Sequence, residues 1–282
     1  MSEARPANLV ADPDLPRQYL DLLKKALTMS LWEARDGSQP FRRRRGLRAK
    51  VTRFLRGNAG RARDAGPDVE AQRMEGRDWP KLAHSMVGMK RLDNLQMCVE
   101  SVLRDGVPGD LIETGVWRGG ASILMRGILQ AYGVRDRRVW VADSFEGLPP
   151  PDAAKYPADA DDVHHENRLL AVSLEEVQAN FRKYGLLDDQ VRFLEGWFKD
   201  TLPGAPIERL AVARLDGDMY ESTIDALRSL YPKLSAGGYL IVDDYGAIPA
   251  CRRAVTDFRG EHGIAEPVQT IDWTGVWWRR EH

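Results

Sequence analysis

The chain is poor in cysteine and has no long apolar run. Its 282 residues include two cysteines, Cys98 and Cys251, too few for a disulfide framework or a zinc-ligand pattern. Two unpaired thiols suit a reducing compartment. No apolar stretch approaches membrane-spanning length, and the first residues show no signal-peptide core. We therefore expect a cytoplasmic protein without a membrane partner.

The sequence also lacks a net charge and internal repeats. Its formal charge is −1, because 41 Lys and Arg residues nearly balance 42 Asp and Glu residues. This balance gives no electrostatic reason to expect a nucleic-acid partner. A hydrophobic content of 43% and a charged content of 29% are typical of a globular protein. The length allows one large α/β domain with additions, or two small domains.

Acidic residues are absent from the arginine-rich residues 41–63. Leu47, Val51, Phe54 and Leu55 would share one face of a helix in this segment. A basic amphipathic helix can bind a membrane, a nucleic acid or an acidic partner. An insertion whose apolar stripe packs on its own protein is the simpler interpretation. Glycines around the segment favour a lid that closes over a bound acceptor.

Short apolar runs alternate with helical patterns in the second half of the chain. The runs cover residues 111–112, 139–142, 191–194, 210–215 and 239–242, and the helical patterns cover 121–132, 174–184 and 222–230. This alternation predicts an α/β fold with a mostly parallel, doubly wound sheet. Two more runs flank Asp272-Trp273-Thr274-Gly275 and predict a C-terminal antiparallel hairpin.

The first part of the chain has helical patterns instead. Residues 19–32 and 81–103 carry apolar stripes, and residues 78–80 have the composition of a helix entry. We therefore expect an N-terminal helical extension or lid over residues 1–104, followed by the α/β body over residues 105–282.

Three aspartates end two successive apolar runs of the α/β body. Asp216 follows one run, and Asp243 and Asp244 follow the next, with one helical pattern between them. Both strands of a parallel crossover unit end at the same edge of the sheet, so these carboxylates should lie close together. A hard divalent cation would offset their repulsion. The alternative is that they are ordinary polar strand ends, one of them capping the next helix.

The ends of the other runs predict a nucleoside-containing cofactor. The first is followed by Gly115, Gly119 and Gly120, which allow a tight turn and a close approach of a ligand to the next helix. Their spacing is not the GxGxxG of NAD sites. Asp143 ends the second run, where it can accept hydrogen bonds from a ribose, and Trp197 after the third can face an adenine. Taken one at a time, the glycines also fit a β-turn, Asp143 a helix cap and Trp197 core packing.

Several blocks resemble the macrocin O-methyltransferase family, whose members methylate sugars of glycosylated natural products. They are residues 84–89, 91–95, 112–120, 143–149, 214–223 and 237–245. The resemblance implies a class I methyltransferase fold and an S-adenosylmethionine- and Mg²⁺-dependent O-methyltransferase of antibiotic biosynthesis. A glycosylated small molecule would be the acceptor, with a sugar hydroxyl as the nucleophile. The resemblance also implies a homo-oligomer.

The resemblance assigns roles to individual residues as well. Asp216, Asp243 and Asp244 would be the metal ligands. The cofactor would be surrounded by Ser85, Met86, Glu113, Gly115, Ser122, Asp143, Ser144, Gly196 and Trp197.

The base that takes the hydroxyl proton is a separate question. Metal-assisted catechol methyltransferases carry a lysine three residues after the first metal aspartate, where this chain has Met219. Asp216 is therefore our candidate base, ahead of His84, His164 and His165.

Three other functions stay open at this point. A phenolic acceptor would need the same site. An NAD-linked oxidoreductase would use a similar sheet, but its glycine fingerprint is missing. A binding protein that kept the cofactor fold and used residues 41–63 as a basic arm would have no need of three clustered aspartates.

Overall fold

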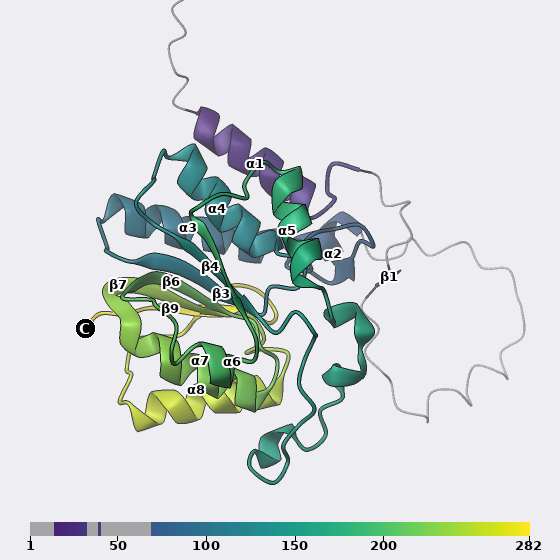
Figure 1. Cartoon of the computed structure of the whole chain (residues 1–282), viewed down its shortest axis with the longest axis vertical. Coiled ribbons are helices and arrows are strands. Elements are labelled where there is room, and N and C mark those ends of the chain that lie inside the picture. Colours follow the sequence, from purple (N-terminus) through teal and green to yellow (C-terminus); the bar gives the residue numbers. More distant parts are fainter. Residues whose placement is uncertain (1–13, 33–38, 41–68) are drawn as a thin grey trace, which may run out of the picture.

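A seven-stranded sheet forms the centre of the computed structural model, which describes residues 14–32, 39–40 and 69–282 (Figure 1). The strand order is β5-β4-β3-β6-β7-β9-β8. The bounds are β3 (Asp110–Thr114), β4 (Val139–Asp143), β5 (Val191–Glu195), β6 (Leu210–Leu215), β7 (Leu234–Val242), β8 (Gln269–Thr270) and β9 (Val276–Arg279). Pairing is parallel from β5 to β7 and antiparallel for β7-β9 and β8-β9. The predicted parallel sheet with a C-terminal antiparallel hairpin is confirmed.

Helices cover both faces of the sheet (Figure 1). One face carries α1 (Leu15–Leu27), α3 (Met89–Arg104), α4 (Gly120–Ala131) and α5 (Leu174–Lys183), and the other carries α6 (Phe198–Thr201), α7 (Tyr220–Leu230) and α8 (Pro249–Glu261). Neighbouring strand residues alternate between two apolar cores: Leu111 belongs to the first and Ile112 to the second. Burial on both faces explains why these strands read as continuous apolar runs.

The N-terminal helices pack against the α/β body. Both α1 and α3 contact α4, and the His84 backbone N–H donates to the Leu27 carbonyl at 2.9 Å. No helix in the described ranges is both long and apolar enough to cross a membrane. Residues 41–63 fall outside the described ranges. The lid, its segment 41–63 and the division between residues 1–104 and 105–282 therefore stay predictions.

The predicted helix entry at residues 78–80 is wrong. The short helix α2 (Val69–Met74) comes earlier, and β2 (Asp78–Trp79) pairs antiparallel with β1 (Gln39–Pro40). Asp78 Oδ2 accepts hydrogen bonds from Nε and Nη2 of Arg73, at 3.1 and 3.0 Å, and this buried ion pair holds Asp78 on a strand instead of at a helix start. A buried ion pair has overridden the local capping preference.

A long connection between β4 and α5, residues 149–172, forms what we call the strap. It contains three short 3₁₀-helices, η2 (Pro157–Asp159), η3 (His164–Glu166) and η4 (Arg168–Leu170). The Asp159 carboxylate accepts from the Tyr220 and Glu221 backbone N–H groups, at 2.7 and 2.9 Å, and so caps α7. At the other end, Trp117 Nε1 donates to the Leu169 carbonyl at 2.8 Å. The strap is thus attached to two loops at the carboxyl edge of the sheet.

Candidate active site

Two loops cross closely at the carboxyl edge of the sheet. Gly115 follows β3 with a φ of +77°, and a Cβ on it would lie 1.6 Å from the Asp216 carbonyl oxygen. No side chain fits there, and the left-handed backbone itself favours glycine. Gly120, at the start of α4, is also too close for a side chain, since a Cβ would lie 2.4 Å from the His84 carbonyl oxygen. The close neighbour that requires glycine at position 120 is thus the protein's own backbone, and the approach of a ligand to this helix start stays a prediction.

A cleft opens beside this crossing. Among its walls are Met86, Gly115, Asp143, Ser144, Trp197 and Asp216, all predicted site residues, together with Trp117, Leu148, Leu170, Asp218 and Glu221. The predicted residues come from the ends of four different strands and from the segment before α3. The residues predicted at the four strand ends therefore line one cleft, and their contact with a cofactor stays a prediction.

Asp143 has a structural role in addition to its place on the cleft wall. Its carboxylate accepts hydrogen bonds from the Val116 N–H at 2.7 Å and the Phe145 N–H at 2.8 Å. Burial raises the pKa of Asp143, and these backbone donors partly oppose that rise. The Ser144 hydroxyl also donates to this carboxylate, at 3.4 Å, so the protein itself takes up most of the about four lone-pair directions of Asp143.

Four predicted cofactor residues lie behind the cleft wall instead of on it. Glu113 is buried, and its carboxylate accepts hydrogen bonds from Ser122 and Arg214. Ser85 is buried and accepts from the Val87 N–H at 3.1 Å. Gly196 turns the chain after β5 with a φ of +133°. These four support the residues in front of them, and their direct contact with a cofactor stays a prediction.

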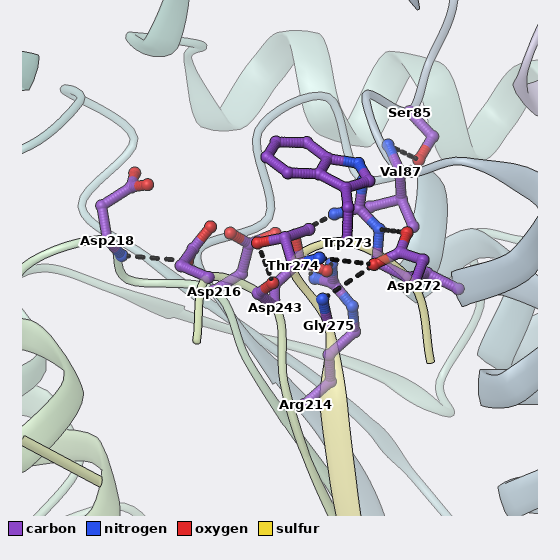
Figure 2. A network of polar contacts seen from close by, with 12 residues as sticks. Ser85, Val87, Arg214, Asp216, Asp218, Asp243, Asp272, Trp273, Thr274 and Gly275 are labelled. Atoms are coloured by element: carbon purple, nitrogen blue, oxygen red, sulfur yellow. Dashed lines mark hydrogen bonds and ion pairs between the residues drawn. The ribbon is translucent and has the colours of Figure 1, made fainter. Parts of the chain in front are cut away.

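The three aspartates do meet. One oxygen from each of Asp216, Asp243 and Asp244 lies within 4.8 Å of the other two, which makes them a group able to hold a metal ion. Figure 2 shows Asp216 and Asp243 together at the centre of a polar network, with Trp273 and Thr274 beside them. Thr274 donates to the Asp243 carbonyl oxygen at 2.8 Å, so the C-terminal hairpin is tied to this cluster.

Two buried arginines form ion pairs with the aspartate cluster, and neither was predicted from the sequence. Arg214 on β6 pairs with Glu113 at 2.6 Å, with Asp216 Oδ2 at 2.9 Å and with Asp243. Arg91 on α3 pairs with Asp243 and, at 2.9 Å, with Asp272. A signal for Arg214 was available: a charged residue inside the fully buried strand LAVARL must have partners. No local signal pairs Arg91 with residues more than 150 positions away.

The charges of this network favour a cation. Five carboxylates meet two guanidinium groups here. Burial and repulsion from Asp243 raise the pKa of Asp216 to about 8, although Arg214 opposes them. Burial, with repulsion from neighbouring aspartates, also raises the pKa of Asp244. Against the effect of burial, Arg214 and Arg91 hold the pKa of Asp243 low. The surplus of negative charge and the all-oxygen donor set fit a divalent cation such as Mg²⁺.

Asp218 is a further acidic residue that the sequence reasoning did not assign to the site. It lines the cleft, and its φ of +54° is rare for a residue other than glycine and costs roughly 1 kcal/mol. Its N–H donates to Asp244 Oδ2 at 3.2 Å. Burial raises the pKa of Asp218 to about 6, while the nearby His164 lowers it. Figure 2 shows its carboxylate pointing away from Asp216 and Asp243.

The strand order with its C-terminal hairpin and the cleft at the carboxyl edge define a class I methyltransferase. The chain belongs to the macrocin O-methyltransferase (TylF) family, whose model matches residues 16–280. It is thus an O-methyltransferase, and the resemblance stated from sequence is confirmed.

Curated relatives and a solved structure agree with this assignment. The chain is 58% identical over 262 residues to the 8-demethyl-8-(2,3-dimethoxy-α-L-rhamnosyl)-tetracenomycin C 4′-O-methyltransferase of Streptomyces olivaceus, covering 93% of this chain and 92% of that one. It is 61% identical to the mycinamicin III 3″-O-methyltransferase of Micromonospora griseorubida, over 75% of this chain and 84% of that one. The structure of the O-methyltransferase NovP superposes with a TM-score of 0.82 at 51% identity, covering 95% of this chain and all of that one.

Replacing Asp143 with alanine tests its place on the cleft wall. We expect Asp143→Ala to weaken S-adenosylmethionine binding by about 1–3 kcal/mol, the scale for a buried polar partner left unpaired. Isothermal titration calorimetry would measure this loss. Asp143→Asn is the matched control, because an amide oxygen can still accept from Val116. An unchanged affinity in both variants would mean that Asp143 only fixes the backbone of Val116 and Phe145.

Proposed function

We propose that this enzyme transfers a methyl group from S-adenosylmethionine to a sugar hydroxyl of a glycosylated natural product, with the aid of Mg²⁺, as a tailoring step of antibiotic biosynthesis. One observation carries the proposal: a triad of carboxylates stands next to a cleft whose wall includes Gly115, Asp143 and Trp197. The sugar acceptor is supported by the relatives, one of which acts on a rhamnosyl tetracenomycin and another on mycinamicin III.

S-adenosylmethionine would bind in the part of the cleft lined by Asp143, Trp197 and Met86, which we call the cofactor half. Asp143 would accept from its ribose, and Trp197 and Met86 would contact its apolar parts. The crossing at Gly115 keeps this half of the cleft next to Asp216. The bound cofactor supplies an electrophilic methyl group, and alignment of the acceptor oxygen with that group provides much of the rate acceleration.

Asp216, Asp243 and Asp244 would hold the cation. A divalent cation there would make the proton of the acceptor hydroxyl more acidic and fix the oxygen in space. The two arginines keep Asp243 in one orientation, because each guanidinium pairs with a different one of its oxygens. The protein thus holds this metal-ligating carboxylate in one orientation before the acceptor binds.

Asp216 is the group we assign to proton transfer. Arg214 Nη1 donates to its Oδ2, whereas Oδ1 accepts no hydrogen bond from the described part of the chain. Oδ1 can therefore take the hydroxyl proton. Met219 is fully buried, so the residue at the lysine position of the catechol enzymes does not reach the cleft.

Removing the metal should stop the reaction. We expect excess EDTA to abolish methyl transfer and added Mg²⁺ to restore it, because the hydroxyl is a weak nucleophile without a cation. S-adenosylhomocysteine formation is the measurement. S-adenosylmethionine affinity, measured in parallel, should change little. Full activity in excess chelator would contradict the metal mechanism.

The acceptor class can be tested directly. Glycosides such as rhamnosyl tetracenomycins and mycinamicin III should be methylated, and phenolic acceptors should not. Transfer to catechols alone would favour the phenolic alternative.

Assembly into a homo-oligomer also stays a prediction, which light scattering in solution can test.

A further inference from the structure

A second groove opens at the edge of the sheet opposite to the catalytic cleft. Its lining residues lie at the amino ends of β3, β4, β5 and β6, and these parallel strands all begin at one edge. Its volume of about 720 Å³ is within the range of small-molecule sites. The groove shares no residue with the catalytic cleft, so a ligand bound there would not compete with the cofactor or the acceptor.

Arginine is the most frequent residue type in the lining of this groove. The five arginines are Arg135, Arg137, Arg138, Arg192 and Arg209. None of them forms an ion pair with a residue of the ranges 14–32, 39–40 and 69–282, whereas Arg91, Arg126 and Arg214 are each ion-paired. An anion that enters the groove therefore meets guanidinium groups whose charge no described carboxylate neutralises by direct contact.

Carboxylates also line the groove, and they are fewer than the arginines. They belong to Asp110, Asp136, Asp189 and Glu208. Asp110 is already occupied, because its Oδ1 accepts from the Arg138 backbone N–H at 2.9 Å and its Oδ2 from Trp140 Nε1 at 2.8 Å. The other three residues are exposed. The described lining of the catalytic cleft has the opposite character, with five carboxylates and Lys199 as the single cationic side chain. Of the two sites, the groove is the one that favours an anion.

Backbone carbonyls hold two of the arginines in place. Arg137 Nη1 donates to the Gly109 carbonyl at 3.0 Å. Arg192 Nη1 donates to the Val191 carbonyl at 3.4 Å. Gln190 Nε2 donates to the Arg137 carbonyl at 2.7 Å and so also fixes the backbone there. Each guanidinium has five N–H groups, so one such bond leaves four for a ligand. Donors that are fixed before a ligand arrives lose little entropy when it binds.

We propose that this groove binds a compact polyphosphate, with Arg137 and Arg192 as the fixed contacts and the other three arginines around them. The planar fork of a guanidinium matches two oxygens of a phosphate group. No aromatic side chain is among the described lining residues, so the site recognises the phosphates and not a nucleobase. Inorganic tripolyphosphate and the triphosphate of a nucleotide should therefore bind alike.

An acidic peptide is the alternative ligand, and the exposed carboxylates of the groove disfavour it. An extended chain of carboxylates would pass close to Asp136, Asp189 and Glu208, and like charges repel each other. A polyphosphate carries its charge on a few adjacent atoms, so it can contact the guanidinium groups and stay clear of these three residues.

The test is isothermal titration calorimetry of the full chain with sodium tripolyphosphate, in EDTA so that no metal links the ligand to the aspartate cluster. ATP and a pentaglutamate peptide are the other probes. The variants are Arg137→Lys, which keeps the charge and loses the fork, and the double variant Arg137→Gln/Arg192→Gln. Arg182→Gln is the matched control, because Arg182 is exposed on α5 and lines no part of the groove. Tm and methyl transfer report whether each variant is folded.

Tripolyphosphate and ATP should bind with similar Kd values, and the peptide about tenfold or more weakly. For tripolyphosphate, the double variant should raise the Kd about tenfold or more, the scale of one hydrogen bond to a charged group. Arg137→Lys should raise it about threefold or more, because an ammonium group cannot form the fork. Arg182→Gln should change it by less than about twofold, as expected for an exposed charge. Saturating S-adenosylhomocysteine should not change the Kd. Methyl transfer should persist in every variant, so this site can fail without the proposed function failing.

Four results would overturn the polyphosphate site. Absence of binding by the folded wild type would show that the groove has no such ligand. Equal Kd values for the double variant and Arg182→Gln would reduce the attraction to diffuse surface charge. Loss of binding in S-adenosylhomocysteine would place the anion in the catalytic cleft. Pentaglutamate binding as tightly as tripolyphosphate would identify the groove as a docking surface for acidic peptides.

Discussion

Asp216→Asn should lower kcat by about 100- to 10,000-fold, the range that a positioned base contributes. The substitution preserves the shape of the side chain, and its amide oxygen can still accept from Arg214. It removes the proton acceptor and one negative ligand of the cation. Because Asp216 repels Asp243 in the folded protein, its neutralisation should not reduce stability. Steady-state kinetics and calorimetry should therefore show a large loss of turnover with a nearly normal cofactor Kd.

Asp188→Asn is the control for this experiment. Asp188 pairs with Arg126 away from the cleft and is 44% exposed, so turnover should stay within twofold. A kcat for Asp216→Asn within tenfold of the wild type would contradict the assignment of Asp216 as the base.

The second large effect concerns stability. Arg214→Met should destabilise the protein by about 3–5 kcal/mol, because it leaves the buried Glu113 and Asp243 without their shared counter-charge. Single-domain stabilities are about 5–15 kcal/mol, so this is a large fraction of the total. Thermal unfolding should show a Tm lower by roughly 10 °C. The double variant Arg214→Met/Glu113→Gln should recover part of the loss, since one carboxylate has become neutral.

Arg228→Met provides the comparison on the surface. Arg228 and Glu261 form an ion pair in which both side chains are about half exposed. Such pairs contribute about 0–1 kcal/mol, so this Tm should hardly change. If Arg214→Met unfolded at the same temperature as Arg228→Met, the buried network would not be the stabilising element inferred from its contacts.

Strand periodicity predicted much of the fold and the centre of the site. The alternation of apolar runs with helical patterns predicted the parallel sheet, and the position of the three aspartates after two runs predicted their convergence. Both follow from a general rule, that parallel strands end at one edge of the sheet. The convergence is confirmed, and the metal that it would hold stays a prediction.

Contacts that depend on long connections could not be predicted in this way. Arg91 reaches Asp272 across 181 residues, and Asp159 of the strap caps α7 through the Tyr220 N–H. Neither pairing follows from a local period, because tertiary packing alone decides where a helix end or a 24-residue connection lies. The true start of the second helical pattern was missed for a similar reason, since Asp78 pairs with Arg73.

The contact between Gly115 and the Asp216 carbonyl has a consequence for anyone who would redesign this enzyme. An attempt to enlarge the cofactor pocket for bulkier alkyl donors would naturally vary the loop after β3. Any side chain at position 115 would displace the backbone that carries the proposed base, so donor range and catalytic power cannot be varied independently there. The strap touches the same cleft without such a crossing. A directed-evolution library should therefore vary the residues of the strap first and keep glycine at position 115.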